Sequence, residues 1–130
     1  MAEHLRQRPK KIVCIEDDRD FLDLLLLMLE GENTDVIAAF GGAEGFETIR
    51  RERPDLILLD LMMPDMHGWE VYMKMKADDE LRNIPVIVVT ALGTRYDKTF
   101  GLNVAKVNDY ITKPFLPSHL RQSVDAALWQ

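Results

Sequence analysis

The sequence predicts an α/β domain in which five parallel strands form a doubly wound sheet covered by five helices. Three observations favour this fold class. Short apolar runs rich in β-branched residues alternate along the chain with stretches whose apolar residues recur at helical spacing. The central run, residues 56–59, is continuously apolar, which is typical of a strand buried on both faces. The chain has 130 residues, the length of one domain with one substantial core.

The first half of the chain predicts two strand–helix pairs ahead of that central strand. Residues 12–15 form an apolar run that ends in acidic residues, and they predict the first strand. Leucines recur at i, i+3, i+4 and i+7 within residues 20–31, so this stretch predicts a helix with an aspartate at its N-cap. A weaker apolar run at residues 36–40 predicts the second strand, and residues 42–52 predict the second helix.

The alternation continues after the central strand. A turn separates that strand from residues 69–78, which predict the third helix with Val71 and Met75 facing inward. Residues 85–90 are dense in β-branched side chains and predict the fourth strand. Residues 94–104 predict the fourth helix.

The chain closes with one more strand and one more helix. Residues 109–112 predict the last strand, and residues 118–128 predict a helix with Leu120, Val124 and Leu128 on one face. Such alternation produces βαβ units and a parallel sheet. With five strands, the flavodoxin-like order 2-1-3-4-5 is the leading choice, which places the carboxyl ends of strands 1 and 3 side by side.

Composition argues against several classes of function. The net charge of −6 disfavours direct binding of nucleic acid, because neutralising phosphates needs a surplus of Lys and Arg. No apolar run approaches the ~20 residues that span a bilayer, so membrane insertion is not expected. Cys14 is the only cysteine, and we expect a buried thiol and a cytoplasmic location. Residues 1–10 are polar and basic and predict a flexible arm before a domain at residues 11–130.

Complementary polar residues stand at the ends of four predicted strands. Glu16 and Asp17 follow the first strand and Asp60 the third, while Thr90 ends the fourth and Lys113 follows the fifth. Crowded carboxylates repel one another, and oxygen-only ligands favour Mg²⁺, with Mn²⁺ also compatible. A cation, a carboxylate, a hydroxyl and a lysine together suit phosphoryl transfer to an aspartate. Each residue alone also fits a plain structural position, such as an acidic turn or a solvated charge.

Four stretches of the sequence resemble a known family in order and in spacing. They are residues 12–18, 58–68, 85–91 and 109–115. Through them the chain resembles the receiver domains of bacterial two-component response regulators over about residues 10–128.

The resemblance implies a function for each of these polar residues. Asp60 is expected to accept the phosphoryl group, which Thr90 and Lys113 would contact. Tyr110 is expected to turn inward as Thr90 moves, so that these two residues form the switch. The implied metal ligands are Glu16, Asp17, Asp60 and the backbone carbonyl of Met62.

The resemblance also implies partners. A sensor histidine kinase or a histidine phosphotransfer protein would donate the phosphoryl group. A downstream effector would read the face built from the fourth helix, the last strand and the fifth helix, where Tyr96 and Lys106 lie. Leu24 and Leu27 fall off the core face of the first helix, so they are either buried under loops or exposed for docking or dimerisation. Both a monomer and a phosphorylation-dependent dimer remain open.

Two departures from the family pattern bear on function. Residues 103–110 lack the usual small–Gly–small stretch and are about one residue longer than usual, which leaves the geometry of the output face open. Met62 and Leu92 stand two residues beyond Asp60 and Thr90, and both are apolar. In the family these positions influence the access of water to the phosphoryl group, so we expect slow self-dephosphorylation.

Other functions fit less well. A phosphatase of the haloacid dehalogenase type would need a second aspartate as general acid where Met62 stands. A flavin-binding protein would want a hydroxyl- and glycine-rich loop where Glu16 and Asp17 would repel phosphate. A receiver-like interaction module that is never phosphorylated is the main alternative. The sequence fits both a stand-alone receiver and a domain cut from a longer regulator.

Overall fold

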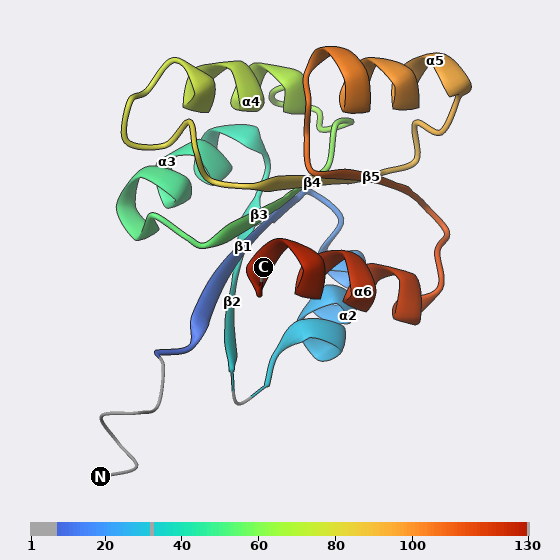
Figure 1. The fold of residues 1–130 in the computed structure, drawn as a ribbon. Helices are drawn as coiled ribbons and strands as arrows, with labels where there is room; N and C mark the ends of the chain where they lie inside the picture. The colour runs from blue at the N-terminus through green and yellow to red at the C-terminus, as the bar shows by residue number, and fades with distance from the viewer. Residues whose placement is uncertain (1–7, 32, 130) are drawn as a thin grey trace, which may run out of the picture.

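Five parallel strands form one sheet with helices on both faces (Figure 1). In this computed structural model, residues 8–31 and 33–129 are described. The strand order β2-β1-β3-β4-β5 confirms the predicted flavodoxin-like topology. The strands are β1 (Lys10–Glu16), β2 (Thr34–Phe40), β3 (Leu56–Leu59), β4 (Val86–Thr90) and β5 (Asp109–Thr112).

The first strand begins earlier than the sequence predicts. Lys10 was expected in the flexible arm, but it belongs to β1 and pairs with Thr34 of β2. Its N–H donates to the carbonyl of Asn33 at 2.8 Å, so backbone pairing extends the strand beyond its apolar run. The rest of the predicted arm, apart from residues 8 and 9, lies outside the described residues.

The helices divide into two layers (Figure 1). One face of the sheet carries α2 (Arg19–Leu29) and α6 (Pro117–Leu128). The other face carries α3 (Gly42–Glu52), α4 (Gly68–Lys76) and α5 (Arg95–Thr99), which runs directly into η1 (Phe100–Val104). No helix in the described ranges is long and apolar enough to cross a membrane.

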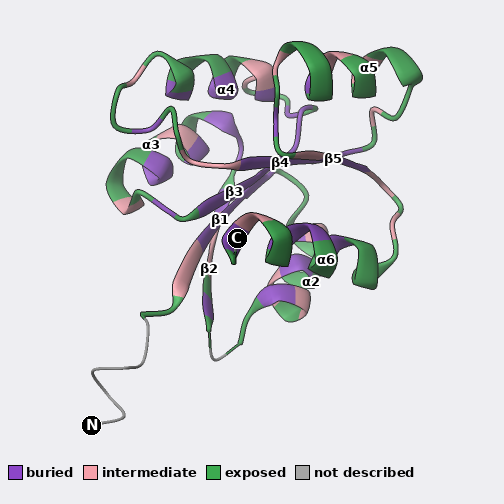
Figure 2. Cartoon of the chain, viewed as in Figure 1, coloured by how far each residue is buried: buried purple, intermediate pink, exposed green. Residues whose placement is uncertain are grey.

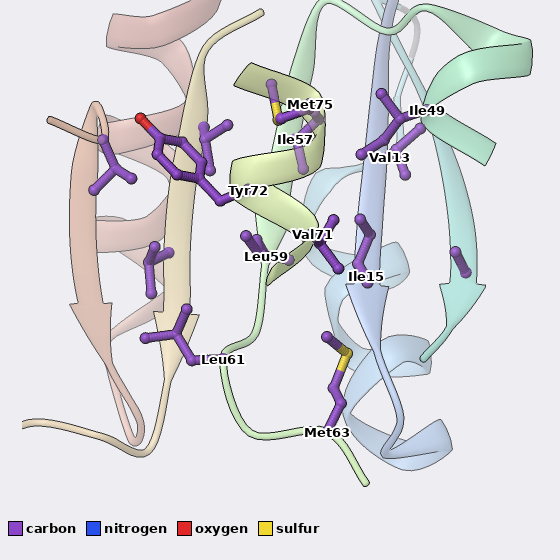
Figure 3. Packing of buried hydrophobic residues seen from close by; sticks show 14 of the residues in the cluster. Val13, Ile15, Ile49, Ile57, Leu59, Leu61, Met63, Val71, Tyr72 and Met75 are labelled. Atoms are coloured by element: carbon purple, nitrogen blue, oxygen red, sulfur yellow. The ribbon is translucent and has the colours of Figure 1, made fainter. Parts of the chain in front are cut away.

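The buried residues form one apolar layer on each side of the sheet (Figure 2). Figure 3 shows side chains of the layer that packs against α3 and α4. Successive side chains of a strand point to opposite faces, so β1 sends Val13 and Ile15 toward α3 and α4, and Ile12 and Cys14 toward α2 and α6. This two-sided burial explains why the strands read as continuous apolar runs. Cys14 is fully buried as predicted, and burial raises the pKa of its thiol to about 12.

Helix α2 buries Leu22, Leu25 and Leu29 of its predicted core face, whereas Leu26 is only partly buried. Asp18 is its N-cap and accepts a hydrogen bond from the N–H of Phe21 at 3.2 Å. The helix ends at Leu29, two residues before the predicted end at Gly31. Leu24 and Leu27 are 47% and 83% exposed, so neighbouring loops do not bury them.

Helices α3, α4 and α6 lie close to their predicted positions. Helix α3 approaches β1 closely, because a Cβ atom at Gly45 would lie only 2.6 Å from Cγ2 of Ile15. In α4, Val71 and Met75 are fully buried, as predicted. Helix α6 begins at Pro117, one residue before the predicted start, and it buries its predicted apolar face of Leu120, Val124 and Leu128.

The fourth helix differs from the prediction of one α-helix over residues 94–104. Only Arg95–Thr99 is α-helical, and Phe100–Val104 continues as a π-helix in which the N–H of Ala105 donates to the carbonyl of Phe100 at 2.8 Å. A π-turn holds one residue more than an α-turn, so this segment deviates from the regular helical spacing that the prediction assumes. Lys106 follows with a φ of +61°, a conformation that favours glycine.

Candidate functional site

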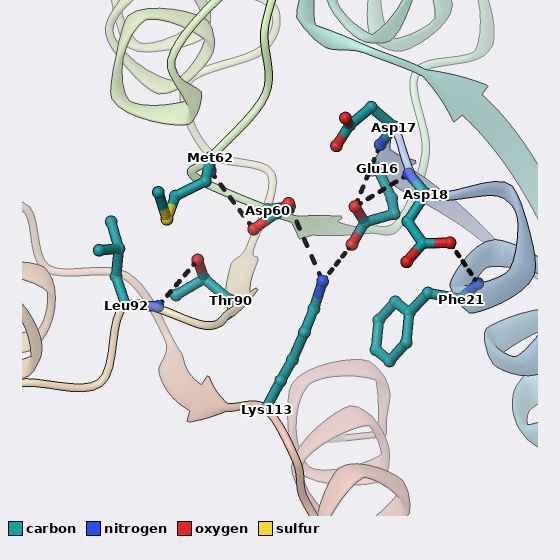
Figure 4. A network of polar contacts seen from close by, with 9 residues as sticks. All are labelled: Glu16, Asp17, Asp18, Phe21, Asp60, Met62, Thr90, Leu92 and Lys113. Carbon is teal, nitrogen blue, oxygen red and sulfur yellow. Dashed lines mark hydrogen bonds and ion pairs between the residues drawn. The ribbon is translucent and has the colours of Figure 1, made fainter.

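Polar side chains from four strand ends meet at the carboxyl edge of the sheet (Figure 4). Strand pairing positions them. The N–H of Asp60 donates to the carbonyl of Ile15 at 3.0 Å, which places Asp60 beside Glu16 at the end of β1. The N–H of Lys113 donates to the carbonyl of Thr90 at 2.8 Å, which links the ends of β4 and β5.

Three carboxylates form an acidic cluster at this edge. One oxygen from each of Glu16, Asp17 and Asp60 lies within 4.8 Å of the others. Glu16 and Asp60 are 3% and 5% exposed, while Asp17 is exposed to solvent. A set of only carboxylate oxygens, partly open to water, fits Mg²⁺, which prefers hard oxygen ligands and retains several waters. The structure therefore brings the three predicted ligand side chains together.

Lys113 inserts its ammonium group into the acidic cluster. Its Nζ lies 2.5 Å from Oε1 of Glu16 and 3.9 Å from Oδ2 of Asp60. The other oxygen of Glu16 accepts hydrogen bonds from the N–H groups of Asp17 and Asp18. Burial raises the pKa of Glu16 to about 7, and the charge of Asp60 adds to this while the hydrogen bond from Lys113 opposes it. Burial and the neighbouring carboxylate therefore disfavour the ionised form of Glu16, and a bound cation would favour it.

The loops after β3 and β4 border the site on the side away from Glu16 and Asp17 (Figure 4). The N–H of Met62 donates to Oδ1 of Asp60 at 3.4 Å, and the N–H of Leu92 donates to Oγ1 of Thr90 at 3.4 Å. Thr90 itself is fully buried. Beside these loops lies an apolar pocket of about 520 Å³, which is lined by Met62, Met63, Pro64, His67 and Leu92.

Tyr110 connects the last strand to the loop that follows Thr90. Tyr110 is only 5% exposed, and its hydroxyl donates to the carbonyl of Leu92 at 2.5 Å. Burial raises the pKa of this hydroxyl to about 12, so it remains a donor. A Cβ atom at Gly101 would lie 2.6 Å from Cδ2 of Tyr110, so glycine lets η1 approach the ring. The side chain is therefore turned inward.

The predicted partner residues lie apart from this site, on α2, on α5 and in the segment after η1. Tyr96 in α5 is 79% exposed, and Lys106 after η1 is also exposed. Leu24 and Leu27 are exposed on α2, on the opposite side of the sheet (Figure 2).

Sequence reasoning missed two aromatic residues next to the site. The ring of Phe21, in the first turn of α2, has its centroid 4.1 Å from Nζ of Lys113. Phe115 packs edge-on against Phe21 with 5.9 Å between ring centroids. Phe115 was visible only as part of the stretch around Lys113, and no spacing in the sequence links Phe21 to Lys113, which lies far along the chain.

Comparison with known proteins points in one direction. The family model of the response regulator receiver domain matches residues 12–125. The alkaline phosphatase synthesis transcriptional regulatory protein PhoP of Bacillus subtilis is 36% identical over 119 residues, which cover 92% of this chain and 48% of PhoP. The DNA-binding response regulator MtrA of Mycobacterium tuberculosis H37Rv is 36% identical over 124 residues, or 95% of this chain and 51% of MtrA. The chain thus spans about half the length of these curated relatives.

Solved structures agree with this likeness. The BeF3-activated N-terminal receiver domain of Klebsiella pneumoniae RstA superposes with a TM-score of 0.82 at 30% identity, covering 92% of this chain and 99% of that one. The receiver domain of the Francisella response regulator 1452 gives a TM-score of 0.83 at 28% identity, covering 92% of this chain and 96% of that one.

Proposed function

Because this chain belongs to the response regulator receiver domain family, we propose that it accepts a phosphoryl group on Asp60 in a Mg²⁺-dependent reaction. Membership makes it a signalling domain of two-component systems rather than a turnover enzyme. One observation carries the proposal to Asp60. This carboxylate is nearly buried at the end of β3, within the acidic cluster and 3.9 Å from the ammonium of Lys113.

The proposed reaction is an in-line displacement at phosphorus. A carboxylate oxygen of Asp60 forms a bond to the phosphorus of a phosphohistidine while the phosphorus–nitrogen bond breaks, and the imidazole leaves with the electron pair. Lys113 and Thr90 contact the oxygens of the transferred group. Mg²⁺, when held by Glu16, Asp17, Asp60 and the backbone carbonyl of Met62, supplies positive charge that offsets the crowded anions. Mn²⁺ has the same ligand preference.

We propose a sensor histidine kinase or a histidine phosphotransfer protein as the physiological donor, acting in the cytoplasm. The direct test uses a small donor instead. The protein is incubated with acetyl phosphate and Mg²⁺, and intact mass spectrometry measures addition of one phosphoryl group. We expect a single adduct that requires the metal. Absence of any adduct, even with a partner kinase present, would favour the alternative of a receiver-like interaction module that is not phosphorylated.

Leu92 suggests how phosphorylation changes a distant face. The N–H of Leu92 donates to Oγ1 of Thr90, and the carbonyl of Leu92 accepts a hydrogen bond from the hydroxyl of Tyr110. A movement of Thr90 toward a new phosphoryl oxygen would therefore shift Leu92, and through it Tyr110. The affected face consists of α5 with η1, β5 and α6, where Tyr96 and Lys106 are exposed. We propose that a downstream effector protein binds this face. The receiver would present the face either as a monomer or as a phosphorylation-dependent dimer.

DNA binding, which the name of MtrA records, is not proposed for this domain. The acidic net charge of −6 disfavours direct contact with nucleic acid. The chain spans about half of MtrA, so DNA binding is stated of MtrA alone.

We predict that the aspartyl phosphate hydrolyses slowly. Met62 and Leu92 line the apolar pocket beside Asp60, and neither side chain can orient a water for attack. Replacing Met62→Asn should shorten the phosphoryl lifetime severalfold, because an amide can hold such a water. The loss of adduct after removal of acetyl phosphate measures this. A lifetime of only seconds in the parent protein, or no change in the variant, would contradict it.

We also predict that Leu24 and Leu27 contact the phosphoryl donor protein. Both leucines are exposed on α2, beyond the core face of that helix. Leu24→Gln together with Leu27→Gln should slow phosphotransfer from a cognate kinase about tenfold, since buried apolar anchors contribute strongly to association. Labelling by acetyl phosphate should not change. Met73→Gln, on a residue of α4 that is 70% exposed, is the matched control. Equal loss with both donors would contradict the docking function.

A further inference from the structure

We infer that Phe21 is a positioning residue for Lys113, holding its ammonium group in the site through a cation–π contact. The inference rests on the proposed function of Asp60 as phosphoryl acceptor. The centroid of the Phe21 ring lies 4.1 Å from Nζ of Lys113, well within the range at which a ring face attracts a cation. Figure 4 shows the ring beneath Asp18, beside the lysine side chain.

The ring is held in place from two sides. The backbone N–H of Phe21 donates to the N-cap carboxylate of Asp18 at 3.2 Å, which fixes this residue in the first turn of α2. Phe115, two residues after Lys113, meets it edge-to-face at 5.9 Å with an interplanar angle of 83°. Both Phe21 and Phe115 are partly buried and pack against the core on the side of α2 and α6.

The contact matters because of the other partners of the lysine. Within the described part of the chain, the ammonium of Lys113 has close contacts with Glu16, Asp60 and Phe21. Two of these partners are carboxylates of the acidic cluster that would hold a divalent cation. The third partner is a neutral ring, which a cation in that cluster does not compete for.

A metal ion in the cluster and the ammonium of Lys113 would share Glu16 and Asp60 and repel each other. The metal would therefore weaken the attraction of these carboxylates for Lys113. The ring of Phe21 keeps its attraction for the ammonium in that state. It therefore retains Lys113 within reach of Asp60 when the phosphoryl group arrives. Without the ring, the flexible four-carbon stem of the lysine lets the ammonium move out into solvent.

The test is a series of isosteric rings at position 21. Phenylalanine carrying one, two or three fluorines is incorporated there, which weakens the negative face of the ring and hardly changes its shape. We expect the rate of labelling by acetyl phosphate and Mg²⁺ to fall with each fluorine, reaching about two- to tenfold with three. Phe21→Leu should show the full loss. Phe21→Trp should label at the parent rate or faster.

Phe46 provides the matched control. Its ring also contacts cations, with Arg50 at 5.9 Å and Lys74 at 5.7 Å, but it lies on α3, on the opposite face of the sheet. Fluorination at position 46 should leave the labelling rate unchanged. A purely structural role for Phe21 predicts no graded response to fluorine, because the substituted rings fill the same space.

A second readout does not depend on phosphorylation. In the resting protein, the ε-methylene protons of Lys113 should show an upfield ring-current shift in the NMR spectrum, and Phe21→Leu should remove it. Labelling that is normal across the fluorine series, or absence of the ring-current shift, would overturn the inference and leave the proposed function intact. A parent protein that is never labelled would instead overturn the proposed function, and this inference with it.

Discussion

Asp60→Asn is expected to abolish labelling by acetyl phosphate, lowering its rate by about a thousandfold or more. An amide oxygen is a poor nucleophile, and this change removes one of the three carboxylates of the acidic cluster. Asparagine has nearly the same shape, so the hydrogen bond from the N–H of Met62 can persist. Intact mass after incubation with Mg²⁺ and the phosphoryl donor measures the effect.

The matched control is Asp35→Asn, which changes a solvent-exposed carboxylate on β2, at the edge of the sheet. It makes the same chemical change and should label at the parent rate. Circular dichroism should show that both variants are folded. An adduct that survives in Asp60→Asn would move the acceptor to another residue, and an adduct lost in both variants would indicate an indirect effect of charge.

Much of this fold is determined by features that are local in the sequence. The run at Leu56–Leu59 is buried on both faces, so its apolar continuity alone indicated a central strand. The site followed from topology, because parallel strands bring their carboxyl ends to one edge. The sequence therefore suffices to group Glu16, Asp17 and Asp60, which the structure brings together.

Features that depend on packing between distant elements could not be predicted. The π-helical turn at Phe100–Val104 is stabilised by contacts with α4. Trp69 meets Phe100 edge-to-face at 5.3 Å, and the hydroxyl of Tyr72 donates to the carbonyl of Ala105 at 2.6 Å. The helical pattern of residues 94–104 carries no trace of these partners. The contact of Phe21 with Lys113 is hidden for the same reason, since it joins the first helix to the last strand end.

Gly68→Ala is expected to destabilise the protein by about 3 kcal/mol and to slow labelling of Asp60 about a hundredfold. Gly68 begins α4, and its N–H donates to the carbonyl of Leu61 at 2.8 Å. A Cβ atom at this position would lie 2.3 Å from the carbonyl oxygen of Asp60 and 2.7 Å from Cα of Leu61. Both neighbours are backbone atoms, so the added methyl group must displace the segment that carries the acceptor carboxylate.

Gly31→Ala tests whether this loss comes from the site rather than from glycine replacement in general. Among the described residues, leaving aside its neighbours in the chain, the atom nearest to a Cβ at Gly31 would be Oγ1 of Thr34 at 4.0 Å. Stability should therefore stay within about 0.5 kcal/mol of the parent, and labelling should not change. Urea unfolding measures the first quantity and intact mass the second. Stability of Gly68→Ala equal to that of the parent would show that the Asp60–Leu61 backbone yields without cost. A normal labelling rate in that variant would show that the position of the carboxylate does not depend on the close approach of α4.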